Sequence, residues 1–184
     1  IPIIFPDKDT MSSYELNLVY VLNSIKEILE SDNNKICGQN IKYDSLILKR
    51  HGISLRGIRY DSMIAEHILN PEKNSYKLDN LSIEYLGYEM QSIEELIGTG
   101  KDQISMADVP LDKTLFYAAE DADITFQISN KTMPLIEKNN LSKPYYEIEL
   151  PLIPVLVEME NTGVFVDRKI LSELSTDVDS MISI

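Results

Sequence analysis

The sequence predicts an α/β protein whose helices pack against a sheet. Short apolar stretches typical of strands, "IPIIF", "KICG" and "GIRY", occur early in the chain. Each is followed by a longer stretch in which apolar residues recur at helical spacing. Strands that alternate with helices in this way usually form a sheet covered by helices, which is the architecture we expect here.

The first helices are marked by periodicity and by capping residues. Apolar side chains recur at near-helical spacing over residues 13–30, and the polar "SDNN" that follows predicts the end of that helix. A second helix is predicted over residues 43–51, with Gly52 as its cap. Asp61 is well placed to be the N-cap of the helix "SMIAEHIL", because its carboxylate can accept from the free amides of the first turn.

Two further helices follow in the middle of the chain. One is predicted over "KLDNLSIEYLG" and ends at Gly87. The longest helical pattern covers residues 111–138. Pro134 lies within this pattern, and we expect it to kink or divide the helix.

The character of the sequence changes after two adjacent asparagines. We expect an amphipathic helix interrupted by Pro151 and Pro154, then "VFVD" and another helix. The predicted organisation is therefore a domain over residues 1–140, with its first strands missing, and a linker with the start of a neighbouring domain over residues 141–184. The chain starts without methionine inside a strand-like stretch and ends within a helical pattern, so we expect it to be cut from a longer polypeptide.

Composition favours a cytoplasmic globular protein. Hydrophobic residues make up 43% of the 184 residues, which is enough for a packed core. No apolar run approaches the ~20 residues that span a bilayer, and the first residues do not have the pattern of a signal peptide, so no membrane partner is expected. The single cysteine, Cys37, excludes an internal disulfide and suits a reducing compartment, where we expect it to be a small buried side chain.

The net charge is −13, from 30 acidic and 17 basic residues. An acidic surface repels phosphates, which argues against a protein that wraps duplex DNA. It does not exclude an enzyme that binds divalent cations first and nucleic acid through them, because bound metal reverses the local charge. The alternative is that the acidity only keeps the protein soluble.

The stretch "GQNIKYD", residues 38–44, gathers hydrogen-bonding groups where a strand meets a helix. Structure alone rarely needs so many there, so the stretch indicates a site. Alternatives stay open for its side chains. Gln39 or Asn40 could tie down the turn, Lys42 could be solvated, and Tyr43 could pack with an exposed hydroxyl.

A second polar stretch, "YAAEDAD", lies inside the longest predicted helix. Tyr117 and Asp121 are four residues apart and share one face, and the alanines between them let a ligand approach closely. Glu120 and Asp123 point elsewhere, and we expect both to be solvated. A solvated acidic face is the alternative reading of the whole stretch.

The chemistry of these side chains points to hard cations. Oxygen ligands without histidine clusters or cysteine pairs suit Mg²⁺ or Mn²⁺ rather than Zn²⁺. Two such ions about 4 Å apart can activate a water and stabilise the leaving oxygen of a phosphodiester, in a site of about four carboxylates. Asp44 and Asp121 would supply two of them.

The two stretches resemble the second and third exonuclease motifs of the proofreading domain of bacterial DNA polymerase I, in polymerase family A. The segments between them, "GISLRGIRYDSMIAEHILNP", "KLDNLSIEYLG" and "EELIGTGKDQISM", follow the order and spacing of the same family. The later "IELPLIPVLVEMENTGVFVD" resembles the segment that leads into the polymerase thumb. The resemblance covers nearly the whole chain and implies a ribonuclease H-like 3′→5′ exonuclease fold, a mixed sheet with flanking helices.

The resemblance implies a role for each matching residue. Asp44 helps to hold the second metal, Asp121 is a direct ligand of the first, and Tyr117 orients the attacking water. The positions that match contacts to the 3′-terminal nucleotides are Gln39, Asn40 and Tyr43, and Lys42 between them is a candidate phosphate contact. The implied partners are the single-stranded or frayed 3′ end of DNA and the rest of the polymerase polypeptide.

The sequence also departs from the family. The first motif, a strand with an Asp-x-Glu pair, is not found before Asp44, so we expect the two-metal site to be incomplete and this chain to be inactive alone. Near Ile93 the family can carry an aromatic side chain that wedges against a base, and here the residue is isoleucine.

Two other functions compete with proofreading. A non-catalytic scaffold domain of a DNA polymerase I is disfavoured because Asp44, Tyr117 and Asp121 are all retained. A ribonuclease D-like RNA-processing exonuclease is disfavoured by the thumb-like tail.

Overall fold

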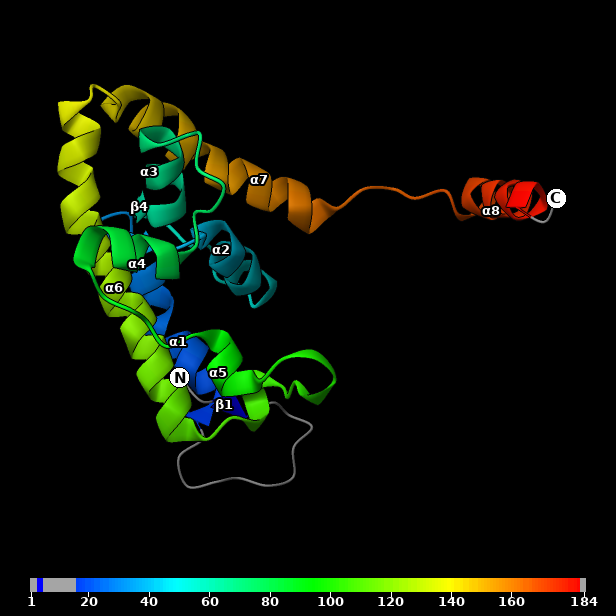
Figure 1. Cartoon of the computed structure of the whole chain (residues 1–184), viewed down its shortest axis with the longest axis horizontal. Helices are drawn as coiled ribbons and strands as arrows, with labels where there is room; N and C mark the ends of the chain where they lie inside the picture. Colours follow the sequence, from blue (N-terminus) through cyan, green and yellow to red (C-terminus); the bar gives the residue numbers. More distant parts are fainter. Residues whose placement is uncertain (1–2, 5–15, 183–184) are drawn as a thin grey trace.

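The computed structural model describes residues 3–4 and 16–182, and this part of the chain is mostly helical, with a few short strands (Figure 1). The strands form two parallel pairs, β1 (Ile3–Ile4) with β2 (Leu16–Asn17) and β3 (Ile36–Gly38) with β4 (Ile58–Asp61). The helices are α1 (Leu18–Leu29), α2 (Ile41–Arg50), α3 (Ser62–Leu69), α4 (Leu78–Leu86), α5 (Ile93–Ile97), α6 (Leu111–Lys138), α7 (Leu150–Thr162) and α8 (Arg168–Ile182). Two 3₁₀ turns, Gly100–Asp102 and Met106–Asp108, precede α6, and a π-helical turn, Pro144–Glu149, precedes α7.

The strands predicted at "KICG" and "GIRY" are confirmed, and the described part of "IPIIF" forms β1, but two helices begin elsewhere than predicted. The prediction that the first helix starts at residue 13 is wrong at residues 16–17, which pair with β1, and residues 13–15 lie outside the described residues. Asn17 then caps α1, its side chain accepting from the amides of Val19 and Tyr20. The second helix starts at Ile41, two residues before the predicted start.

Other local predictions are confirmed. Asp61 is the N-cap of α3 and accepts from the amides of Met63 and Ile64. Gly87 ends α4 in the left-handed conformation, with φ 66°, where a side chain would be strained. The bounds of α6 match the predicted range of 111–138.

The predicted division of α6 at Pro134 and the predicted interruption of α7 are wrong, and a kink of α6 at Pro134 stays a prediction. Pro134 does not divide α6, and α7 continues through Pro151 and Pro154. Pro151 lies in the first turn of α7, where a missing amide costs little. The buried face of α7 packs against α2, and this tertiary contact outweighs the local effect of the prolines.

Two clusters of buried apolar side chains form the core. One lies around β3 and β4 and consists of Ile41, Tyr60, Ala65, Ile136, Tyr145, Leu150, Ile153 and Val157. The other lies between α4 and α6 and consists of Leu78, Leu81, Met90, Ile124 and Ile128. Residues on both sides of Leu141 share the first cluster, and a domain boundary near this residue stays a prediction.

The helix α8 lies apart from the other helices, at the end of an extended segment over residues 163–167 (Figure 1). Every residue from 163 to 182 is exposed. Within the described ranges, none of the helices is both long and apolar enough to cross a membrane.

Candidate active site

One open cleft of about 840 Å³ brings the two predicted motifs together. It is lined by the end of β3 and by residues of α2, α3, α4, α5 and α6. From "GQNIKYD" it is lined by Gln39, Asn40, Tyr43 and Asp44, and from "YAAEDAD" by Tyr117 and Asp121. Asp44 and Asp121 therefore line the same cleft, and their joint binding of metal stays a prediction.

Asp44 lies in the first turn of α2, where the positive end of the helix dipole favours a carboxylate. The surrounding protein nevertheless raises the pKa of Asp44, because it partly excludes water, and the charge of buried Asp61 adds to this. A carboxylate in this position is stabilised by any cation that enters the cleft.

Tyr117 and Asp121 lie one turn apart on α6 and face the cleft. Burial raises the pKa of Asp121 to about 6, the charges of Asp79 and Glu120 also raise it, and the Tyr117 hydroxyl opposes them. Burial raises the pKa of Tyr117 to about 12, together with the charge of Asp121. The phenol is therefore a neutral hydrogen-bond donor at physiological pH.

Two carboxylates that the sequence did not single out also line the cleft. Asp79 comes from the first turn of α4, and Glu94 from the first turn of α5. The charge of each acts on Tyr117, and Asp79 also acts on Asp121. The sequence placed both residues near the start of a helix, but no sequence pattern indicated that they line the same cleft as Asp121.

Both polar atoms of the Gln39 side-chain amide form hydrogen bonds. Its Nε2 donates to the carbonyl of Tyr76 at 2.9 Å, and its Oε1 accepts from the Ser62 hydroxyl. These contacts tie the β3–α2 turn to the start of α3 and to the segment before α4. They favour the alternative in which Gln39 holds the turn.

The other polar residues of the first motif differ in whether their side chains can contact a ligand in the cleft. Asn40 has a left-handed backbone, with φ 53°, and its side chain makes no capping hydrogen bond. Tyr43 is 61% exposed and lines the cleft. Lys42 does not line the cleft and forms an ion pair with Glu160 of α7.

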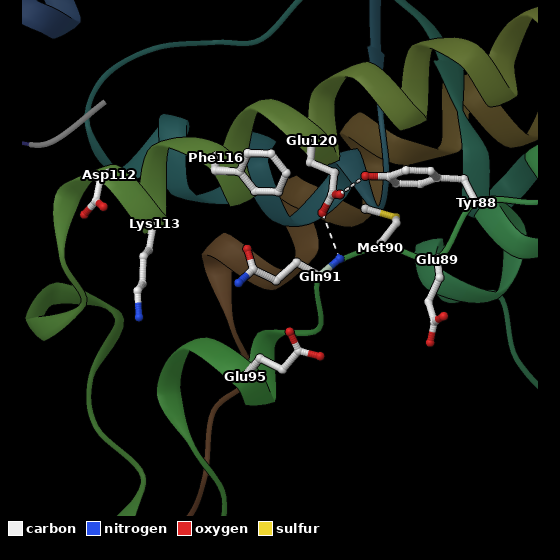
Figure 2. A pocket seen from close by; sticks show the side chains of 9 residues that line it. All are labelled: Tyr88, Glu89, Met90, Gln91, Glu95, Asp112, Lys113, Phe116 and Glu120. Carbon is white, nitrogen blue, oxygen red and sulfur yellow. Dashed lines mark hydrogen bonds between the residues drawn. The ribbon is translucent and has the colours of Figure 1, made fainter.

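The prediction that Glu120 is solvated is wrong. The residue is 9% exposed, and its carboxylate accepts from the Tyr88 hydroxyl at 2.6 Å and from the amide of Gln91 at 3.0 Å (Figure 2). The sequence could not show this, because the partners come from the segment between α4 and α5. Asp123 is exposed, as predicted, and accepts from Gln127.

The carboxylates of the cleft are of the kind that bind divalent metal, but they do not form a complete metal site. Asp44 and Asp121 supply oxygen atoms of the type that Mg²⁺ and Mn²⁺ prefer. Within residues 3–4 and 16–182, however, no three His, Cys, Asp or Glu side chains are grouped closely enough to hold a metal ion.

Comparison with known proteins gives a consistent result. Residues 6–137 match the sequence model of a 3′–5′ exonuclease family of A-type DNA polymerases. The chain is 36% identical to DNA polymerase I of Rhizobium leguminosarum over 85% of its own length and 15% of the relative's, and 32% identical to that of Pseudomonas aeruginosa over 86% and 18%. It thus spans less than a fifth of the length of these relatives.

A solved structure shows the same fold at lower identity. The polymerase domain of Pol1 from M. smegmatis, in complex with DNA primer-template and dNTP, superposes with a TM-score of 0.67 at 19% identity, covering 94% of this chain and 27% of that one. The family model covers most of the chain and includes both motifs of the cleft. The chain belongs to the 3′–5′ exonuclease family of A-type DNA polymerases.

Proposed function

We propose that the cleft removes nucleotides from the 3′ end of single-stranded or frayed DNA by hydrolysis of the terminal phosphodiester. The observation that carries the proposal is the meeting of Asp44, Tyr117 and Asp121, from two distant motifs, in one open cleft. Membership of the exonuclease family supports it.

Asp44 and Asp121 would hold divalent metal, Mg²⁺ or Mn²⁺, in a two-metal site. When bound, such ions activate a water and neutralise charge on the phosphate. Burial raises the pKa of Asp121 and the charges of Asp79 and Glu120 add to this, so this carboxylate gains more from a nearby cation than a solvated one does.

Tyr117 orients the attacking water in this proposal. Because its pKa is raised to about 12, its hydroxyl stays protonated and donates a hydrogen bond without acting as a base. Asp121, one turn later on the same helix, offers an acceptor to the same water. The alanines beside them leave room for the terminal phosphate.

The strand end lies along the start of α2. The exposed ring of Tyr43 offers a surface on which a base can stack, and such stacking is tolerant of sequence. Asn40 offers an amide that no helix cap engages. Gln39 shapes this wall through its bonds to Ser62 and Tyr76.

For the whole protein we propose the role of a proofreading domain in a cytoplasmic DNA polymerase I. The partner of the domain is then the rest of the polymerase polypeptide, and residues 141–184 lead toward it. The proposed fold is ribonuclease H-like, with the two parallel strand pairs belonging to a mixed sheet.

The test uses the full-length natural chain and single-stranded DNA labelled at its 5′ end. With Mg²⁺ the label should pass into a ladder of shorter products, and Asp121→Ala should abolish the ladder while DNA synthesis is retained. Asp123→Ala, the loss of an exposed carboxylate on the same helix, is the control and should leave the ladder intact. Undiminished degradation by the Asp121→Ala protein would contradict the proposal.

A further inference from the structure

We propose that Glu120 is a positioning residue for the DNA strand end, because it anchors the segment that carries α5 against the cleft. The inference rests on the proposed exonuclease function and assigns a role that lies outside the two metal-binding carboxylates. Glu120 touches neither DNA nor metal in this proposal, and it acts through the wall that faces Tyr117.

The carboxylate of Glu120 is buried and fully engaged. One oxygen accepts from the hydroxyl of Tyr88 at 2.6 Å, and the other accepts from the backbone amide of Gln91 at 3.0 Å (Figure 2). A buried carboxylate is unfavourable unless such bonds replace water. Two bonds to one short segment therefore fix residues 88–91 to α6.

This segment sets the position of α5. Gln91 is followed by Ser92, whose hydroxyl caps α5, and then by Ile93 and Glu94, which line the cleft. The helix has five residues and one buried side chain, Leu96, too little to hold it in place by itself. The segment before it is held by the tether to Glu120, by Met90, which is buried in the second core cluster, and by the Ser82 hydroxyl, which donates to the carbonyl of Tyr88 at 2.8 Å.

One turn of α6 carries both the residue that holds the segment before α5 and the residue that faces the cleft. Glu120 and Asp121 are neighbours and point about 100° apart around the helix axis, so one faces the tether and the other faces the cleft. The Glu120 bonds therefore help to set how far the α5 wall lies from Asp121. Loss of these bonds should loosen the wall that holds the strand end and leave Tyr117 and Asp121 in place.

The test uses the full-length natural chain with single-stranded DNA and Mg²⁺. Glu120→Ala should raise KM about three- to tenfold with kcat changed less than about twofold, since binding rather than chemistry is affected. Glu120→Gln should restore KM, because the amide oxygen can accept from Gln91 and the amide nitrogen can donate to the Tyr88 oxygen. Asp123→Ala should leave both constants unchanged. Hydrogen exchange of residues 88–97 should be faster in Glu120→Ala only.

Three results would overturn the inference in different ways. An unchanged KM in Glu120→Ala, with Asp121-dependent degradation present, would refute the inference and leave the exonuclease function standing. Equal loss in Glu120→Ala and Glu120→Gln, in step with lower melting temperatures, would show a purely structural carboxylate. A natural protein without Asp121-dependent degradation would refute the proposed function and this inference together.

Discussion

The carboxylate of Asp61 accepts a hydrogen bond from the backbone amide of Ile41 at 2.7 Å. Its other oxygen caps α3 through the amides of Met63 and Ile64. One buried side chain thus joins the starts of two helices beneath the cleft. The amide of Asp61 itself donates to the Tyr145 hydroxyl at 2.9 Å, which links this junction to the segment before α7.

Substitution of Asp61 should therefore cost more than the loss of one cap. Asp61→Ala leaves two helix starts without an acceptor, and we expect the free energy of unfolding to fall by about 2–4 kcal/mol. Urea denaturation measures this, with the exposed Asp123→Ala as control. A loss no larger than that of the control would show that water replaces the carboxylate at both helices.

The hydroxyl of Tyr117 should matter for turnover and little for binding. Tyr117→Phe removes the donor that orients the water and keeps the ring, so kcat should fall about tenfold or more with KM nearly unchanged. Single-turnover kinetics on single-stranded DNA in the full-length chain separates the two. A purely structural tyrosine would instead give a lower melting temperature with normal specific activity.

Gln39 and Asn40 are neighbours and should respond differently to substitution. Gln39→Ala removes two hydrogen bonds and should lower the free energy of unfolding by about 1–2 kcal/mol. Asn40→Gly suits the left-handed backbone at φ 53°, so stability should change by less than about 0.5 kcal/mol, while affinity for single-stranded DNA should fall. Denaturation and fluorescence anisotropy with a labelled oligonucleotide distinguish the roles. Unchanged DNA affinity in Asn40→Gly would remove Asn40 from the interface.

The reactivity of Cys37 should be low at neutral pH and should report on the cleft. Burial raises the pKa of this thiol above its usual 9.0, a nearby Ser129 hydroxyl only partly opposing it, so less thiolate is present at pH 8 than in a free thiol. Alkylation by iodoacetamide should be slower than for the urea-unfolded protein and should speed up as pH rises past 9.

Cys37 is the only cysteine and lines the cleft, so mass spectrometry should also show protection by a bound oligonucleotide. Equal rates in folded and unfolded protein would contradict the burial.

These 184 residues, assayed alone, should be folded and inactive. Four carboxylates line the cleft, but no three His, Cys, Asp or Glu side chains of the described residues are grouped closely enough to hold a metal ion, and Mg²⁺ does not readily give up water for ligands without the right geometry. Circular dichroism should show helical structure, and a nuclease assay with Mn²⁺ should show no digestion. Digestion above that of a variant carrying both Asp44→Ala and Asp121→Ala would show that carboxylates within the chain complete the site.

Local signals predicted the parts of the fold that depend on neighbouring residues. The Asp61 cap, the Gly87 end of α4 and the bounds of α6 could all be predicted, because each depends on side chains or periodicity within a few turns. That Asp44 and Asp121 line one cleft was expected from their ligand chemistry and from resemblance to a family rather than from spacing.

What was missed depends on contacts between distant segments. The early start of α2 needs Asp61 as an acceptor, and the burial of Glu120 needs Tyr88 and Gln91. The continuous α7 shows that packing can outweigh the cost of Pro154 inside the helix. None of these contacts produces a periodicity of apolar residues from which it could be predicted.

The unbroken helix α6, 28 residues long, also limits where the chain can change length. It presents Tyr117 to the cleft, Ile124 and Ile128 to one core cluster and Ile136 to the other. A single inserted residue would rotate everything after it by about 100° and take either the catalytic face or the core faces out of register. The mostly exposed segment over residues 98–110 carries no such constraint, so insertions and deletions should be tolerated there and not between Tyr117 and Ile136.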